Sequence, residues 1–189
     1  MRFFTWLSSV SAQFPIIEGT GSSGSGTAPT LPLFARWFRE LGVSAALVEG
    51  DSFHAYDREQ MLAILERARV RGGNVSHFGP AANHWERLEK LFEEFGAHGT
   101  GTLRRYLHTE AEAIAAGQSA GTFTPWEKLP PTDVLFYEGL HGGVETAEID
   151  VARHADLLIG MPPTVNREWV QKTGGDSGEA GCGAAGVAA

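Results

Sequence analysis

Two carboxylates each follow a short apolar run that could form a buried strand. Asp51 comes after the run 44–49 and a glycine, and Glu138 follows directly on the run 133–137. An acid at the end of a strand could take a proton from a substrate hydroxyl, which makes Asp51 a candidate general base. A carboxylate at Glu138 could hold Mg²⁺, directly or through water, beside nucleotide phosphates. The plainer alternatives are a turn-capping Asp51 and a Glu138 paired with a buried neighbour.

A stretch rich in glycine and serine could bind phosphate. It consists of Gly21, Ser22, Ser23, Gly24, Ser25, Gly26 and Thr27. Glycines let backbone N–H groups converge on phosphate oxygens, and the N-terminus of a following helix adds positive potential. Against the pattern GxxxxGK[ST], both glycine positions match, whereas Thr27 takes the lysine position and Ala28 the hydroxyl position. Judged alone, the stretch could equally be a turn or a linker.

Basic side chains near Asp51 could hold an anionic substrate. His54 and Arg58 follow it closely, and Arg58 could form paired hydrogen bonds with a phosphate, or be a solvated helix residue. The seven histidines include no HExxH pattern and no close pair backed by a carboxylate, so the sequence predicts no dedicated zinc site.

Composition narrows the possible partners. The chain has 189 residues, of which 42% are hydrophobic, and a formal net charge of −8. The acidic balance disfavours nucleic acid as a partner, and no apolar run is long enough to span a bilayer. The single cysteine, Cys182, cannot form an internal disulfide. These features are compatible with a cytoplasmic protein. The first residues only faintly resemble a secretory signal.

Strand and helix patterns alternate along the chain. Helical patterns cover 31–41, a segment from Asp57, 83–95 and 108–116, and strand patterns begin at Pro15 and cover 44–49, 133–137 and 155–159. Alternation of this kind predicts a mostly parallel α/β sheet with its ligand site beyond the strands' carboxyl ends. The predicted organisation is an extension over 1–14, a domain over 15–172 and a disordered Gly/Ala-rich tail over 173–189.

Several short blocks appear in a characteristic order. They are GSSGSGT (21–27), VEGDSFHAYDR (48–58), SHF (76–78), YLH (106–108), FYEGLHG (136–142), Val165-Asn166 and Glu168–Lys172. The order, and above all EGDSFH and FYEGLHG, resembles bacterial-type phosphoribulokinase over about Pro15 to Lys172. The resemblance implies a P-loop NTPase-like fold and homo-oligomers. It also implies transfer of the ATP γ-phosphoryl group, with Mg²⁺, to the C1 hydroxyl of ribulose 5-phosphate, giving ribulose 1,5-bisphosphate for the Calvin cycle.

The resemblance also assigns roles to residues. It implies that Gly21 to Pro29 form the ATP loop, with Thr27 expected in this branch. Asp51 matches the general base, and Glu138 matches the second essential acid near Mg-ATP. The positions that match substrate-binding segments are His54, Arg58, Tyr106, His108 and Lys172.

Four departures from the family pattern bear on these expectations. Ala28 lacks the loop hydroxyl, Leu62 replaces a basic residue, and Glu40 replaces an arginine linked to NADH activation. After Lys172 the composition changes abruptly, which predicts a truncated or frameshifted chain with the C-terminal part of the fold missing. The alternatives to an active kinase are an inactive nucleotide-binding remnant and a uridine-kinase-like P-loop kinase.

Overall fold

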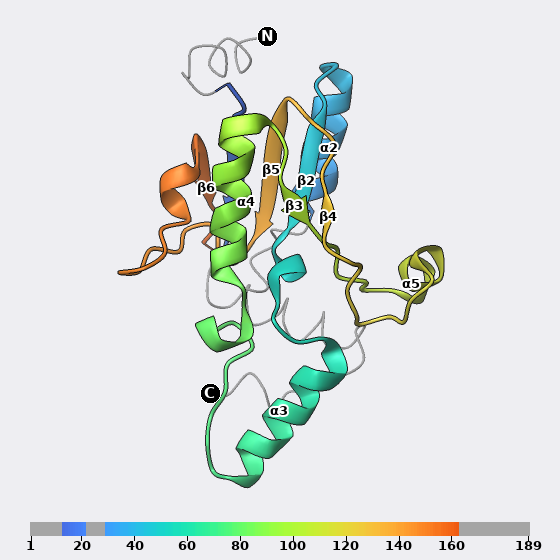
Figure 1. Ribbon diagram of the computed structural model, residues 1–189, viewed down its shortest axis with the longest axis vertical. Helices are drawn as coiled ribbons and strands as arrows, with labels where there is room; N and C mark the ends of the chain where they lie inside the picture. Colours follow the sequence, from blue (N-terminus) through green and yellow to red (C-terminus); the bar gives the residue numbers. More distant parts are fainter. Residues whose placement is uncertain (1–12, 22–28, 163–189) are drawn as a thin grey trace.

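The computed structural model describes residues 13–21 and 29–162. Its centre is a four-stranded parallel sheet in the order β2-β5-β1-β6. The strands are β1 (Ile16–Thr20), β2 (Ala45–Glu49), β5 (Val134–Gly139) and β6 (Leu157–Gly160). Since all four run the same way, their carboxyl ends meet at one edge, at the lower end of the sheet in Figure 1.

Two helices cover the two faces of this sheet. The helix α2 (Thr30–Glu40) packs on one face and α4 (Trp85–His98) on the other (Figure 1). Successive strand side chains point to opposite faces, so Phe136 of β5 joins the α2 cluster and Tyr137 joins the α4 cluster. The result is the three-layer α/β arrangement that the alternating pattern predicts.

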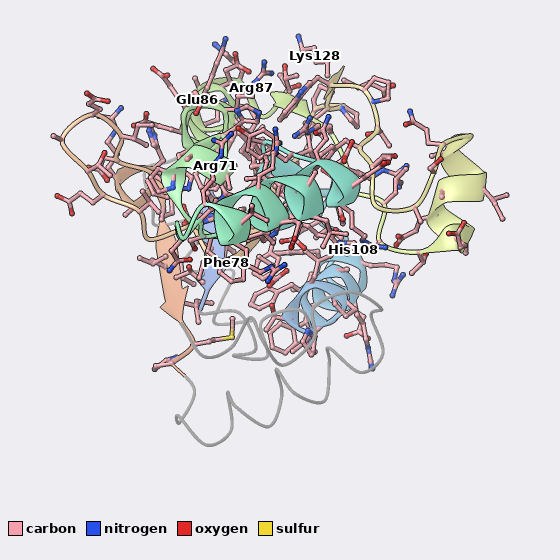
Figure 2. All side chains as sticks on the ribbon, turned by 90° about the horizontal axis from the view of Figure 1, so that it is seen from below. Arg71, Phe78, Glu86, Arg87, His108 and Lys128 are labelled. Atoms are coloured by element: carbon pink, nitrogen blue, oxygen red, sulfur yellow. The ribbon has the colours of Figure 1, made fainter. Side chains whose placement is uncertain are left out.

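The remaining elements lie around this framework. They are η1 (Gly50–Phe53), α3 (Arg58–Val70), η2 (Pro80–Ala82), β3 (Thr102–Leu103), α5 (Glu110–Ala116), β4 (Glu127–Lys128) and η3 (Ala152–His154). Strands β3 and β4 pair antiparallel as a two-stranded sheet. The helix α3 extends beyond the carboxyl edge of the main sheet, and Figure 2 looks at the molecule from that side. Among the described residues, no helix has the length and apolar character needed to cross a membrane.

The helix patterns are confirmed with small shifts at their ends. Asp57 caps α3 and Thr109 caps α5, each through a capping box in which the third helical residue bonds back to the cap. The helical spacing of the apolar residues in 31–41 predicts one apolar face, and in α2 only part of that face is buried. Phe34 and Phe38 are buried against Phe136, whereas Leu33, Trp37 and Leu41 stay exposed in the described part of the chain. The predicted tail, 173–189, lies outside the described residues.

One buried acid stands out in the core. Glu18, in the middle of β1, is fully buried, and neither of its carboxyl oxygens has a hydrogen-bond partner. Burial raises the pKa of Glu18 to about 9, because a charged carboxylate is far less stable there than in water. The folded protein therefore holds a proton at neutral pH that the unfolded chain releases near pH 4.5.

This proton makes stability depend on pH. Between about pH 4.5 and 9 the folded state binds one proton more than the unfolded state, so the free energy of unfolding falls as pH rises, by about 1.4 kcal/mol per pH unit from this group. We expect Glu18→Gln to remove that slope in urea titrations at several pH values. Glu93→Gln, an exposed change on α4, should keep it. Parallel slopes for the native chain and Glu18→Gln would contradict the assignment.

Candidate active site

The two acid-bearing strands come very close where they end. Gly50 follows β2 and Gly139 ends β5, and the hydroxyl of Tyr137 lies against both. A Cβ on Gly50 would lie 2.8 Å from that hydroxyl and 3.0 Å from the Cα of Gly139, so only glycine fits without displacing backbone. The sequence neighbours Gly50-Asp51 and Glu138-Gly139 therefore place both acids at a single point of the sheet edge.

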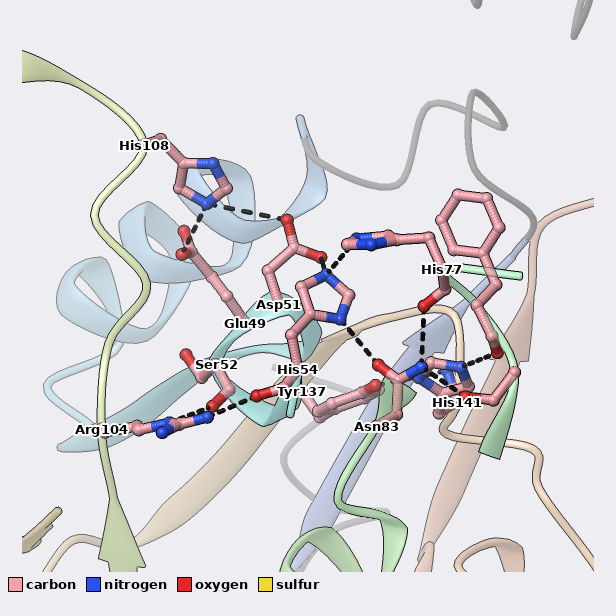
Figure 3. Close-up of polar contacts among 12 residues, drawn as sticks. Glu49, Asp51, Ser52, His54, His77, Asn83, Arg104, His108, Tyr137 and His141 are labelled. Atoms are coloured by element: carbon pink, nitrogen blue, oxygen red, sulfur yellow. Dashed lines mark hydrogen bonds and ion pairs between the residues drawn. The ribbon is translucent and has the colours of Figure 1, made fainter. Parts of the chain in front are cut away.

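Asp51 lies in η1, directly beyond β2, with histidines around it (Figure 3). Its Oδ1 is 3.2 Å from Nε2 of His54, and its Oδ2 is 3.8 Å from Nε2 of His108. The side chain remains 51% exposed, so a bound molecule could reach the carboxylate. The turn-capping alternative for Asp51 does not account for this setting, since both of its oxygens face imidazole rings.

The charge state of Asp51 suits a base. Partial burial by itself raises the pKa of Asp51, but the hydrogen bond with His54 and the nearby positive charge of His54 and His108 outweigh it, and the pKa is lowered. Asp51 is therefore ionised at neutral pH and free to accept a proton.

His108 is held towards its protonated form. Its Nε2 is 3.7 Å from Oε2 of Glu49, and this contact, with further help from the charge of Asp51, raises the pKa of His108 although burial works against it. A cation beside Asp51 can meet an anionic group on a substrate.

The other predicted substrate residues close the ring around Asp51. Arg58 begins α3, and its Nη2 donates to the backbone oxygen of His108 over 3.3 Å. The ring of Tyr106 lies 4.8 Å from that of His108 and 6.3 Å from that of His54. The tertiary structure thus brings together four of the five predicted substrate-binding residues, and the fifth, Lys172, lies outside the described residues.

Glu138 lies near the end of β5, paired with residues of both neighbouring strands, β1 and β2. It pairs with Gly19 of β1 and Glu49 of β2, and the strand alternation puts it on the face that α2 covers. The N-terminus of α2 on that face directly follows the predicted phosphate loop. Of the predicted loop, the structure describes Gly21 and Pro29, and residues 22–28 lie outside the described part.

Magnesium fits this setting only as an ion shared with a nucleotide. No group of three or more His, Cys, Asp or Glu side chains that could hold a metal occurs among the described residues. Mg²⁺ typically takes one or two carboxylates and completes its shell with water and phosphate oxygens. Glu138 offers the hard oxygen ligand that such binding requires.

Side chains that the sequence did not single out hold the site in place. Arg104 donates from Nε to the backbone oxygen of Ser52 over 2.9 Å and from Nη2 to that of His54, one inside η1 and one directly after it. Its guanidinium stacks on Phe123 and Trp126, at 3.6 and 4.6 Å from the ring centres. Burial and the charge of Arg87 lower the pKa of Arg104 to about 10, which still leaves it charged at neutral pH. No spacing rule connects Arg104 with residues some fifty positions earlier.

Comparisons with known proteins show the family of this chain. The model of the Phosphoribulokinase / Uridine kinase family matches residues 16–189. The chain belongs to this family. It is 53% identical over 173 residues to a probable phosphoribulokinase of Escherichia coli K12, with 91% of the chain and 60% of that protein covered. It is 47% identical over 163 residues to a phosphoribulokinase of Sinorhizobium medicae, with 86% and 56% covered.

A solved structure supports the same family and fold. The phosphoribulokinase from Rhodobacter spheroides matches with a TM-score of 0.75 and 40% identity over 91% of this chain and 58% of that one. The predicted resemblance to phosphoribulokinase and the parallel α/β fold of a P-loop kinase are thereby confirmed. The chain spans about 60% of the length of the curated relatives that it matches.

Loss of the contacts that Arg104 makes with the backbone of Ser52 and His54 should destabilise the fold. Arg104→Gln removes donors from two backbone oxygens and the stacking on two rings, so we expect the free energy of unfolding to fall by about 2 kcal/mol. Arg105→Gln is the matched control, because Arg105 is exposed, and it should change stability by about 0.5 kcal/mol or less. Urea unfolding measures the free energy of unfolding of both variants. Equal decreases would show that the contacts of Arg104 do not stabilise the fold.

Proposed function

We propose that this chain carries the catalytic half of an ATP-dependent kinase that phosphorylates ribulose 5-phosphate at its C1 hydroxyl. The product is ribulose 1,5-bisphosphate, and the place of such a reaction is the cytoplasm and the Calvin cycle. The observation that supports this most is the half-exposed Asp51 carboxylate at the strands' carboxyl ends, ringed by His54, Arg58, Tyr106 and His108. Relatives at 43–53% identity carry the name phosphoribulokinase.

Each group of residues has a task in this proposal. Asp51 accepts the proton of the attacking hydroxyl, for which its lowered pKa keeps it ionised. The cationic His108 and the Arg58 guanidinium hold the sugar phosphate: the His108 ring faces Asp51, and Arg58 contacts the backbone of His108.

The nucleotide is proposed to bind beside Glu138, on the face of the sheet that α2 covers. The loop 21–29 holds the ATP phosphates, and Glu138 binds the Mg²⁺ that they carry. Bound Mg²⁺ neutralises charge on the transferring phosphoryl group. Lys172 is proposed as a further substrate contact on the strength of the sequence resemblance alone. Homo-oligomers are proposed on the same ground.

Substitution of the general base tests the chemistry. Asp51→Asn keeps the shape of the side chain but cannot accept a proton, so ribulose 5-phosphate-dependent ADP release with Mg-ATP should fall by about 10²- to 10⁴-fold. Asp57→Asn is a matched control, because asparagine also caps helices well and α3 should persist. Similar rates in both variants would rule out Asp51 as the base. Preferential turnover of uridine would instead favour the uridine-kinase alternative.

The raised pKa of His108 predicts a pH dependence of substrate binding. The proton that Glu49 and Asp51 stabilise on His108 persists above pH 6.5 and is lost as pH rises further. We expect KM for ribulose 5-phosphate to increase by about fivefold across that loss, because a charged hydrogen bond becomes a neutral one. His108→Gln should have a raised KM that no longer changes in this range. An unchanged pH profile in the variant would exclude the role.

A further inference from the structure

One buried amide side chain connects a turn beside the site to the ring of His54. Asn83 follows η2 and donates from Nδ2 to the backbone oxygens of His77 and Gly79, at 3.0 and 2.9 Å. Both carbonyl oxygens can only accept, so the nitrogen of the amide faces them and its orientation is settled. The amide oxygen, Oδ1, therefore faces Nδ1 of His54, at 2.6 Å (Figure 3).

This orientation fixes how the ring of His54 is used. An amide oxygen can only accept, so Nδ1 of His54 donates in the bond with Asn83. The other ring nitrogen, Nε2, lies 3.2 Å from Oδ1 of Asp51, and an ionised carboxylate also only accepts. Both ring nitrogens thus face an acceptor, and the hydrogen on Nε2 is the one that reaches Asp51.

The remaining neighbour of Nε2 is compatible with this arrangement. Nε2 of His77 lies 3.1 Å from Nε2 of His54. Burial, followed by the positive charge of His54, lowers the pKa of His77 to about 4, so His77 is neutral at neutral pH. Its ring brings no second positive charge to the contact between His54 and Asp51, and its Nε2 can serve as a further acceptor.

The bond between Asn83 and His54 joins two segments whose backbones already pair. The two residues form an antiparallel bridge, with hydrogen bonds from Ala55 to Ala82 and from His84 to Phe53 on either side of it. Asn83 and His54 are both buried, so water cannot readily replace their side-chain bond. The half-exposed carboxylate of Asp51 is thereby connected through His54 to a fixed part of the backbone.

We propose that Asn83 is a positioning residue for the general base: its amide oxygen holds the Nδ1 hydrogen of His54 and so directs the Nε2 hydrogen of that ring to Asp51. The role in turnover rests on the proposed function, whereas the hydrogen arrangement does not. A ring held at Nδ1 keeps Asp51 oriented for the substrate hydroxyl. Without the amide oxygen the ring can turn, and Asp51 loses the partner of its Oδ1.

Histidine NMR on the ¹⁵N-labelled 189-residue chain tests the hydrogen arrangement without any turnover. The signals of His54 are those missing from a His54→Gln sample. We expect Nδ1 of His54 to carry a hydrogen that exchanges slowly with water, because this atom is bonded to Asn83 in a buried setting. A bare Nδ1 in the native chain would overturn the proposal without the need for any Asn83 variant.

Two substitutions separate the bond to His54 from support of the turn. Asn83→Leu removes the acceptor and both donors, whereas Asn83→Asp keeps an acceptor for His54 and loses both donors. Urea unfolding should show both variants to be less stable than the native chain. The slowly exchanging Nδ1 hydrogen should disappear in Asn83→Leu only. Asn74→Leu, the same change at an exposed position, should alter neither property.

The kcat for ribulose 5-phosphate should follow the NMR signal and not the stability. A misplaced base slows the reaction, so we expect kcat to fall by roughly 10- to 100-fold in Asn83→Leu, and Asn83→Asp should recover most of this loss. Equal losses in the two variants would show that Asn83 supports only the turn, and would overturn the proposal. Absence of kinase activity in the native chain would count against the proposed function alone, because the NMR signals still decide the hydrogen arrangement.

Discussion

The close approach of β2 and β5 at their carboxyl ends is the constraint on which the site depends. Gly50 and Gly139 allow it, because the hydroxyl of Tyr137 occupies the space that any larger side chain would need. After β2 the chain leaves the sheet through the short helix η1, which carries Asp51, while Glu138 lies in the last paired register of β2 and β5. Backbone packing thus places the two residues proposed as base and metal ligand.

Beyond the sheet edge, a single antiparallel bridge between His54 and Asn83 pairs the backbone, and side-chain donors bind further carbonyls. Arg104 binds two carbonyls of the Asp51 turn, while Asn83 and His141 bind the carbonyls of residues 77–79. Buried carbonyls need hydrogen-bond donors. These side chains supply them and so fix the backbone conformation of segments that are neither helix nor strand. The fixed backbone keeps His54 and His108 at set distances from Asp51, and the lowered pKa of Asp51 depends on these distances.

One buried side chain in the core, Glu18, lacks the hydrogen-bond partners that the other buried polar groups discussed above have. Glu18 lies on β1 between β5 and β6, in register with Tyr137 and Leu158, yet its carboxyl oxygens have no hydrogen-bond partner. The family fold therefore forms in spite of this residue, since the apolar packing of β1 and β5 outweighs one buried acid. Burial of this kind leaves no trace in local sequence pattern.

The sequence by itself determined the order of strands and helices, the acids that follow them, and the family, because periodicity, caps and glycine spacing act within a few residues. It also pointed to His54, Arg58, Tyr106 and His108 as one set through resemblance. Only the tertiary structure decided that α2 buries Phe34 and Phe38 but exposes Trp37, and that Arg104 and Asn83 organise the site. These outcomes depend on contacts between residues about thirty to one hundred positions apart, whose geometry arises only once the sheet has formed.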